Sequence, residues 1–410
     1  MTVRVNKDSF NLREKLSELE RPIGLKGSEL MGSESAQEAR DLVSAGRKNI
    51  VINGNMMICQ RFGYNNVQTV TNERHLDRFL LRNTTGGTLQ VKQSPASGSP
   101  FDNVMELNCT GADTSVTTDF ARIQYIVEGY DLRGIDWGKV GSKDYLTLSF
   151  WVKTNATGDY HVSIENSSDS YYPLMVKKYT INDSNIWKKV VVTFPPVGEY
   201  TLAPGHAFER ENGRGMAITW ALAVGSSYNA ATDGVWRSSG YQMSTSSQRN
   251  FMDTSGNNFY ITGVQLERGK NATDFEHRPY GEELALCQRY YQNTNGNLSY
   301  TGTNYGESAY TGWQYDATAG SIRIRLPVQM RANPTASVVG TITNSPGADG
   351  TIGAYGNAGF MNPSSVTATE TSPLSIRINA GGLSGSGKDA WGLYFYGTYL
   401  TANVKLSAEM

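Results

Sequence analysis

Apolar and polar residues alternate in many short segments of this 410-residue chain, and this pattern restricts the fold more than any other sequence feature. In the segment YLTLSFWV, the residues Leu146, Leu148, Phe150 and Val152 occupy every second position, so a β-strand places them on one face. The same signal occurs in NIVING, RIQYIV, DYHVSIE, WKKVVVTF, MAITWALAV and NFYITGVQLE. Clusters of turn-forming residues separate these segments. This succession of strands predicts a mainly β protein with a two-sheet antiparallel sandwich.

Trp151 falls on the opposite face of that strand, together with Thr147 and Ser149. Two interpretations of this tryptophan stay open. It is either a platform on which a ligand stacks, or a side chain that covers a sheet edge or a loop, and the second role is the commoner one.

Charge and hydropathy exclude several kinds of partner. Charged residues make up 18% of the chain and nearly cancel, leaving a net charge of −1, so no basic field is available for nucleic acid. The N-terminus lacks the apolar stretch of a signal peptide, and no run long enough to span a bilayer follows. We therefore expect no nucleic-acid partner and no membrane insertion.

The three cysteines, Cys59, Cys109 and Cys287, show no C-x-x-C spacing and are expected to be reduced and structural. Two of them begin the tripeptide CQR, at Cys59 and again at Cys287. We interpret these as buried thiols at the two borders of one folded module. Their Gln and Arg neighbours are expected to hydrogen-bond strand ends or adjacent subunits.

Residues 1–48 differ from the rest because they are charged and favour helices. Leu12, Leu16 and Leu19 form one apolar stripe, and Leu42 and Val43 lie in a second short helix that a capping box can start. Such short one-sided helices need a surface to pack on. The segment is therefore predicted to be an attachment or oligomerisation anchor.

Composition changes again after a short predicted helix at Glu282–Gln288, in which Leu284 and Cys287 begin a buried stripe that continues to Tyr291. Residues 292–410 are rich in Gly, Ser, Thr and Tyr and carry little charge. Strands are expected at SIRIRLPVQM, ASVVGTIT, LSIRINA and AWGLYFYGTYLTANV. A second, smaller β-domain accounts for this pattern.

No set of residues identifies an enzyme. The four histidines lack metal-binding spacing, so neither a metal nor another cofactor is expected. The best acidic cluster, HAFERENGRG, places Glu209 and Glu211 beside Arg210 and Arg214. Glycosidases use two carboxylates about 5–10 Å apart, but a mixed-charge loop is more often a solvated surface patch.

An ordered series of motifs between Asn49 and Tyr291 resembles the carbohydrate-binding-like jelly roll of tailed-phage tail fibres and related appendages. The series comprises NIVINGNMMICQR, LDRF, LTLSFWVKTNATGDYHVSI, IWKKVVVTF and NFYITGVQLERGKNATDFEHRPYGEELALCQRYYQ. The N-terminal run resembles the leader of marine-phage appendage proteins, and MRANPTAS resembles a recurring element of their small terminal β-domains.

This resemblance implies a non-catalytic structural protein of the virion that is assembled in the host cytoplasm, most simply as a homotrimer. Its parts would be a virion-attachment segment at 1–48, a jelly-roll domain at 49–291 and a smaller C-terminal β-sandwich at 292–410. The partners would be other virion proteins and a host-surface glycan. Two alternatives stay open: a capsid-surface fibre, decoration or tail adaptor, and a glycan depolymerase.

Loops and tips are the expected contact points for such a glycan. Aromatic faces stack on the C–H faces of sugars while polar side chains meet the hydroxyl groups. The candidate ligand-binding residues are Tyr228, Trp236 and Tyr241 in the jelly roll and Tyr305, Tyr310, Trp313 and Tyr355 in the C-terminal domain.

Overall fold

The computed structural model describes residues 48–410 except 138–140, 167–173, 198–207, 231, 238–239, 294–309, 316–317, 344–349, 357–358, 362, 384–389 and 397–402. The chain divides into two units, Met1–Lys48 and Asn49–Met410, and the fold below is that of the second. The predicted anchor residues Leu12, Leu16, Leu19, Leu42 and Val43 lie outside the described residues. Within those residues the protein is mainly β, which confirms the predicted class.

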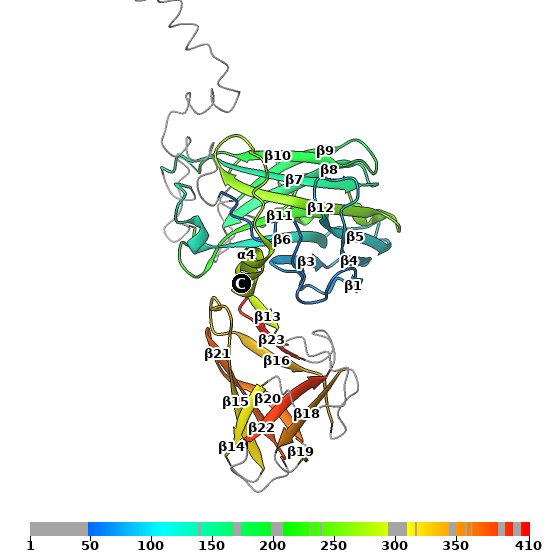
Figure 1. The fold of residues 1–410 in the computed structure, drawn as a ribbon. Coiled ribbons are helices and arrows are strands. Elements are labelled where there is room, and N and C mark those ends of the chain that lie inside the picture. Colours follow the sequence, from blue (N-terminus) through cyan, green and yellow to red (C-terminus); the bar gives the residue numbers. More distant parts are fainter. Residues whose placement is uncertain are drawn as a thin grey trace, which may run out of the picture. The chain divides into compact units, whose positions relative to one another are not determined.

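Two six-stranded antiparallel sheets build the predicted sandwich (Figure 1). Sheet A runs in the order β1 (Gln68–Thr69), β4 (Thr88–Pro95), β5 (Asn103–Gly111), β12 (Asn258–Arg268), β7 (Leu146–Thr154) and β10 (Lys188–Phe194). Sheet B runs in the order β2 (Arg74–Leu76), β3 (Phe79–Asn83), β6 (Phe120–Glu128), β11 (Arg214–Val224), β8 (Gly158–Asn166) and β9 (Leu174–Ile181). The late strands β12 and β11 lie between earlier ones, as in jelly rolls.

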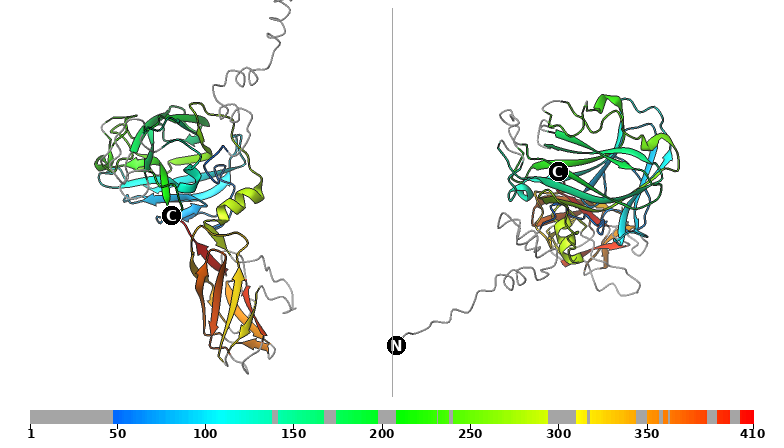
Figure 2. Two further views of the ribbon diagram at one scale, coloured as in Figure 1. Left: turned by 90° about the vertical axis from the view of Figure 1, so that its left-hand side faces the viewer. Right: turned by 90° about the horizontal axis from the view of Figure 1, so that it is seen from above.

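Among the described residues, three 3₁₀ helices, η1 (Gly129–Leu132), η2 (Ser226–Tyr228) and η3 (Phe251–Asp253), lie in the connections between strands. The α-helix α4 (Tyr280–Gln288) follows β12. Figure 2 shows α4 beside the sandwich and not between its sheets. No helix in this part of the chain is long and apolar enough to cross a membrane.

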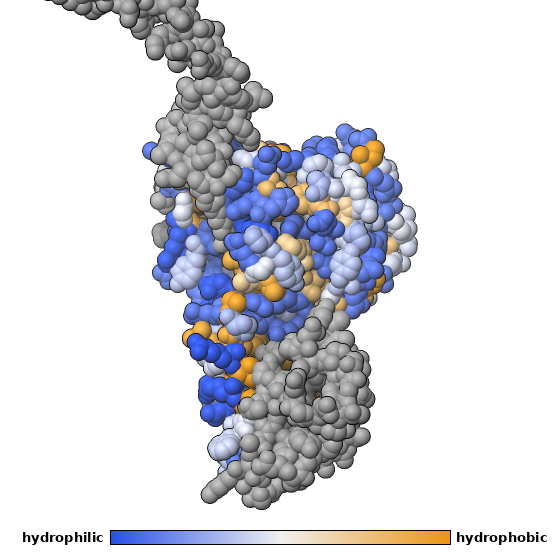
Figure 3. All heavy atoms as spheres, viewed as in Figure 1, coloured by the Kyte–Doolittle hydropathy of each residue, from blue (hydrophilic) through white to orange (hydrophobic). Residues whose placement is uncertain are grey.

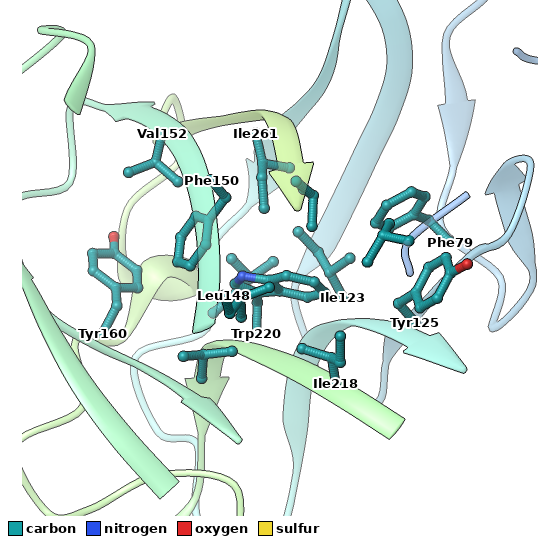
Figure 4. Close-up of a cluster of buried hydrophobic side chains, with 14 of the residues drawn as sticks. Phe79, Ile123, Tyr125, Leu148, Phe150, Val152, Tyr160, Ile218, Trp220 and Ile261 are labelled. Carbon is teal, nitrogen blue, oxygen red and sulfur yellow. The ribbon is translucent and has the colours of Figure 1, made fainter. Parts of the chain in front are cut away.

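The space between sheets A and B is filled by the alternating apolar residues. Phe150 of β7 and Trp220 of β11 meet edge to face across the sandwich, with ring centroids 5.8 Å apart (Figure 4). Phe79 lies on the other side of Trp220, at 6.4 Å. Since all three side chains are fully buried, truncating Trp220 to Ala is expected to cost about 3–5 kcal/mol.

The first and last segments of the sandwich are joined by hydrogen bonds. The Asn49 amide donates to Glu276 at 2.6 Å, and the Arg278 guanidinium donates to the carbonyl oxygens of Asn49 and Val51. The Asn53 amide donates to the carboxylate of Glu283. We call this set of contacts the clasp. It places the start of the jelly roll directly beside its closing helix.

The two CQR motifs lie on this closure, in partial agreement with the sequence prediction. Cys287 is fully buried among Ile52, Ile58 and Tyr290, but Cys59 is only half-buried against the main core. The prediction of two buried thiols is therefore confirmed for Cys287, whereas Cys59 is partly buried.

Gln60 of the first motif and Arg289 of the second do bond to strand ends within this chain. Gln60 donates to Asp77 at 2.7 Å and to the carbonyl oxygen of Tyr291 at 3.0 Å. Arg289 pairs with Glu128 at 2.6 Å. Gln60 of the first motif thus reaches the chain just after the second motif, whereas Arg289 of the second motif bonds to the end of β6.

The remaining strands form two further sheets. Sheet D contains β13 (Tyr291–Asn293), β23 (Asn403–Ser407) and β16 (Thr335–Val339). Sheet E runs in the order β17 (Thr341–Ile342), β18 (Thr351–Gly356), β22 (Ala390–Tyr396), β14 (Tyr310–Gln314), β15 (Ala319–Arg325), β21 (Ser375–Gly381) and β20 (Ser365–Ser372), with β19 (Gly359–Met361) on β18. They share a hydrophobic core of their own, although the domain boundary at 291/292 stays a prediction.

Candidate functional site

A pocket of about 210 Å³ opens on the outer face of sheet A, the face that points away from the sandwich core. It is lined by Pro100, Phe101, Ser149, Trp151, Lys189, Gly263, Asp274, Phe275 and His277. The strand register explains its position, since Trp151 of β7 pairs with Lys189 of β10 and Thr262 of β12. We call it the Trp151 pocket.

Gly263 makes room for the pocket wall. The register between β12 and β7 shifts after Thr262, and Gly263 has a φ of +61° at this bulge. A Cβ atom at Gly263 would overlap the Phe101 ring and lie 3.1 Å from Trp151. A glycine is therefore required both for the backbone conformation and for the close approach of Phe101.

Aromatic rings form much of the wall. Phe101 and Phe275 meet edge to face with centroids 5.0 Å apart, and His277 lies 5.9 Å from Phe101. Trp151 packs into the same cluster and stays partly exposed. The pocket therefore has aromatic surface on its wall, and Trp151 also covers the Phe101 segment, so both interpretations of this tryptophan stay open.

Polar groups of both charges surround these rings. Lys189 and Asp274 are exposed, whereas Ser149 is 3% exposed. Next to the pocket, the Lys153 ammonium lies 5.0 Å from the Trp187 ring centroid and 4.4 Å from that of Tyr260. This combination of ring faces with donors and acceptors at their edges suits a sugar ring, which has C–H faces and a hydroxyl rim.

Two of the predicted jelly-roll residues come together elsewhere, outside sheet B. The rings of Tyr228 and Tyr241 lie 5.8 Å apart, and the Tyr241 hydroxyl accepts a hydrogen bond from Arg122. Trp236 packs instead on Trp137 at 5.4 Å and donates to the carbonyl oxygen of Pro196 at 3.2 Å. All three predicted residues are partly buried and hold connections in place.

The predicted residues of the C-terminal domain are described only in part. Trp313 lies on β14 and is 65% exposed. Tyr310 and Tyr355 belong to β14 and β18. Tyr305 lies outside the described residues.

The outer face of sheet B carries a polar seam that the sequence did not lead us to predict. Gln124 of β6 donates to Glu165 of β8 and to Thr219 of β11, both at 3.2 Å. Glu165 is 1% exposed, and this burial raises the pKa of its carboxyl to about 7 although Arg122 acts against the shift. Polar residues at alternate positions of β6 and β8 were the signal that could have revealed the seam.

In the acidic segment HAFERENGRG, the described residues hold neighbouring backbone segments in place through hydrogen bonds. Arg210 donates to the carbonyl oxygens of Leu132 and Ile135, at 2.7 and 3.1 Å. Glu209 accepts from the amide of Glu211, which itself lies 3.9 Å from Arg133 at the surface. The expectation that the protein is not an enzyme stays a prediction. In the part of the chain that the structure describes, no group of three His, Cys, Asp or Glu residues could hold a metal ion.

No family model and no curated protein matches this chain. Solved structures similar to it include the enzymatically active domain of bacteriophage CBA120 tailspike protein 4, with a TM-score of 0.28 and 14% identity over 54% of this chain and 21% of that one. A second similar structure is a family 11 carbohydrate-binding module from Clostridium thermocellum in complex with a β-1,3-1,4-mixed-linked tetrasaccharide. Its TM-score is 0.27, and the two sequences are 15% identical over 50% of this chain and 98% of that one.

A xylan-binding domain of family 22 from Paenibacillus barcinonensis has a TM-score of 0.24 and 16% identity over 46% of this chain and 90% of that one. This chain spans about a fifth of the tailspike structure. All three TM-scores lie below 0.5, so these similarities assign no function to this chain. Any functional proposal has to be argued from the residues of the chain itself.

Proposed function

We propose that this protein is a glycan-recognition subunit of a tailed-phage appendage and that the Trp151 pocket takes one sugar ring of a host-surface glycan. The observation that carries the proposal is the outward-facing Trp151 within an aromatic wall that Ser149, Lys189 and Asp274 border. Part of the Trp151 ring packs against this wall, and the rest is accessible to a ligand.

The assignment to a virion rests on the resemblance of the motif series and of the N-terminal leader to phage appendage proteins. In this proposal the segment 1–48 attaches the protein to other virion proteins, and the protein acts as a homotrimer. Electron microscopy of virions that carry an antibody against this protein tests the location. Label at the tail supports an appendage, label on the capsid supports the alternative of a head fibre, and no label on intact virions contradicts a virion role.

Binding to an array of bacterial surface polysaccharides, followed by calorimetry with the bound glycans, tests the pocket. Trp151→Ala removes the stacking surface, so the glycan affinity is expected to fall about tenfold, corresponding to about 1.4 kcal/mol. Tyr64→Ala is the matched control because Tyr64 is 55% exposed and lies outside the pocket. Equal affinity of the wild type and Trp151→Ala, with both proteins folded, would refute the assignment of the pocket.

A further inference from the structure

Trp151 has a defined set of neighbours on the outer face of sheet A. Lys189 of β10 lies directly opposite it on one side, and Thr262 of β12 lies opposite it on the other. Along β7, the residues two positions away, Ser149 and Lys153, share its face. Residues directly opposite each other have Cβ atoms about 4.5–5.5 Å apart, so a molecule on the Trp151 ring meets both cross-strand neighbours. Two of the four neighbours are cationic, and the other two carry only a hydroxyl group.

The positive charge of Lys189 is not neutralised within the part of the chain that the structure describes. Its ammonium has neither an ion-pair nor a hydrogen-bond partner among the described residues. The side chain is exposed and lines the pocket. Two other lysines of sheet A are engaged, since Lys188 donates to the carbonyl oxygen of Thr180 at 2.6 Å and Lys92 pairs with Glu106 at 3.5 Å. Lys189 therefore brings an available cation to the rim of the pocket.

Lys153 adds a second positive charge farther along the same face. Its ammonium lies 4.4 Å from the ring centroid of Tyr260 and 5.0 Å from that of Trp187, so two aromatic rings fix its position. These rings attract a cation through their quadrupole but carry no net charge, so they do not cancel that of Lys153. Since Lys153 is two residues from Trp151 on β7, its Cα atom lies about 7 Å farther along the strand. One cation thus flanks the Trp151 ring across the strands, and one lies along them.

The carboxylate of the pocket comes from a different element. Asp274 lines the pocket from the segment that follows β12, and β12 and β10 lie on opposite sides of β7. Lys189 can pair with an anionic group, whereas Asp274 can accept hydrogen bonds from hydroxyl groups. A sugar ring that carries an anionic group at one edge and hydroxyl groups at another matches these two residues.

We propose that the Trp151 pocket selects an acidic sugar ring, whose anionic group pairs with the Lys189 ammonium while its C–H face packs on Trp151. Lys189 sets this specificity, and Lys153 attracts a neighbouring acidic residue of the same glycan chain. An ammonium pairs with carboxylate, sulfate and phosphate alike, because it is a point charge without a fixed fork of donors. The inference rests on the proposed glycan recognition by this pocket and deepens it by naming the class of ligand.

A lysine on an edge strand has another common role, which is to keep the edge from pairing with a second chain. β10 is the last strand in the order of sheet A, so this role applies to both Lys188 and Lys189. Only Lys189 shares the face of Trp151, because adjacent residues of a strand point to opposite faces. Lys188 therefore separates the edge role, which both lysines have, from the ligand role.

Two other classes of partner fit the pocket less well. The centres of protein interfaces are poor in charge, whereas Lys189 and Asp274 both line this pocket. Figure 3 shows hydrophilic residues over much of the visible face of the jelly roll, with smaller apolar patches between them. Nucleic acid needs an extended basic field, and the chain as a whole has a net charge of −1.

Calorimetry of the full chain with two matched pairs of probes tests the proposal. Polygalacturonate is compared with its methyl ester, and dextran sulfate with neutral dextran, so the members of each pair share one backbone. The two pairs also separate carboxylate from sulfate. In at least one pair the charged probe is expected to bind more tightly than its neutral partner, and more weakly as salt rises.

Lys189→Gln should lower the affinity for that charged probe about tenfold and leave the affinity for its neutral partner unchanged. Lys189→Arg keeps the charge and should keep most of the affinity. Lys188→Gln is the matched control, because it removes the same charge from the adjacent residue on the opposite face of β10.

The ligand class is wrong if neither charged probe binds more tightly than its neutral partner, or if Lys188→Gln and Lys189→Gln lose affinity equally. Tighter binding of a duplex DNA than of both charged glycans at the same salt would also overturn it. Trp151→Ala separates this inference from the proposed function. If the pocket binds glycans without selecting charge, Trp151→Ala weakens charged and neutral probes alike and Lys189→Gln weakens neither. If the pocket is not a glycan site, both variants leave every affinity unchanged.

Discussion

Glu409 and Arg78 are 331 residues apart in the sequence and form an ion pair of 2.8 Å, in which the two side chains are 6% and 1% exposed. Arg74 and Arg61 also reach the Glu409 carboxylate, at 3.1 and 3.3 Å. The Arg78 guanidinium lies 3.5 Å from the centroid of the Tyr290 ring. A single carboxylate after β23 thus contacts three arginines that come from the start of the jelly roll.

Removal of this carboxylate is expected to be strongly destabilising. Glu409→Gln leaves buried guanidinium groups without their counter-charge, and breaking a buried pair in this way costs about 3–5 kcal/mol. Urea denaturation at pH 7 measures the loss. Glu211→Gln is the control, since the Glu211 side chain is 77% exposed in its ion pair with Arg133. Loss of this surface pair should lower the free energy of unfolding by less than about 0.5 kcal/mol. Equal stability of both variants would contradict the importance of the Glu409 cluster.

Acid is expected to weaken the same cluster. Burial alone would raise the pKa of Glu409, but the cations of Arg74, Arg78 and Arg61 outweigh it and lower the pKa below its ordinary value of 4.5. The stabilisation is therefore complete above the unfolded pKa and is lost as pH falls through the lower folded pKa. Wild type and Glu409→Gln should therefore become more similar in stability as the pH falls from the unfolded pKa of 4.5 through the lower folded pKa, which acid titration of both proteins checks.

Glu165 is expected to show the opposite dependence on pH. Its pKa is raised from 4.5 to about 7 by burial, so the folded protein favours the neutral carboxylic acid. Stability from this residue is complete below the unfolded pKa and is lost as pH rises through about 7. Glu165→Gln should thus be more stable than the wild type at pH 8, by up to about 3 kcal/mol, and similar to it at pH 4. Urea denaturation of both proteins at pH 4 and pH 8 tests this. If the difference in unfolding free energy between Glu165→Gln and the wild type is the same at both pH values, Glu165 stays charged.

Gly263 should tolerate no side chain. Gly263→Ala combines a positive φ with overlap of the new Cβ and the Phe101 ring, so about 1–3 kcal/mol of stability should be lost together with the shape of the Trp151 pocket. Gly141→Ala is the matched control because Gly141 has a φ of +75° and no atom lies within 4 Å of the position that its Cβ would take. Thermal unfolding compares the two variants, and equal losses would show that Phe101 moves aside freely.

The thiols are expected to react slowly in the folded protein. Burial raises the pKa of Cys59 to about 12 and that of Cys287 above its ordinary range, so little thiolate is present at pH 8. Iodoacetamide followed by mass spectrometry should modify both residues in denaturant and leave Cys287 unmodified in the native state. Cys59 should react faster than Cys287 because it is only half-buried. Rapid native modification of Cys287 would mean that α4 opens.

Local patterns predicted much of this fold from the sequence. Alternation in a window of eight residues is enough to assign β7 and to place Trp151 on its outer face. The position of the two CQR motifs at the borders of the module was also predicted, but from the resemblance to phage appendage proteins and not from local patterns. What alternation could not show was whether the outer face of a strand stays open or is covered by a loop.

The Trp151 pocket and the polar seam depend on pairings between strands that are far apart in the sequence, so no short stretch of sequence contains them. The Trp151 pocket needs β12 beside β7 and a bulge at Gly263, and local sequence patterns reveal neither. Glu165 and Gln124 meet only because β11 lies between β6 and β8. Tyr241 was predicted as a ligand contact from its residue type, and in the structure its hydroxyl accepts a hydrogen bond from Arg122. Three arginines around Glu409 come from a different part of the chain altogether.

The clasp has a mechanical consequence. Asn49 and Glu276 hold the two ends of the jelly roll side by side, so a pull that enters at one end and leaves at the other first loads these bonds and those from Asn49 and Ile50 to β12. Apart from β12, the strands of sheets A and B would therefore carry little of this load until the clasp had broken. The Trp151 pocket on sheet A would therefore keep its shape under tension as long as the clasp holds.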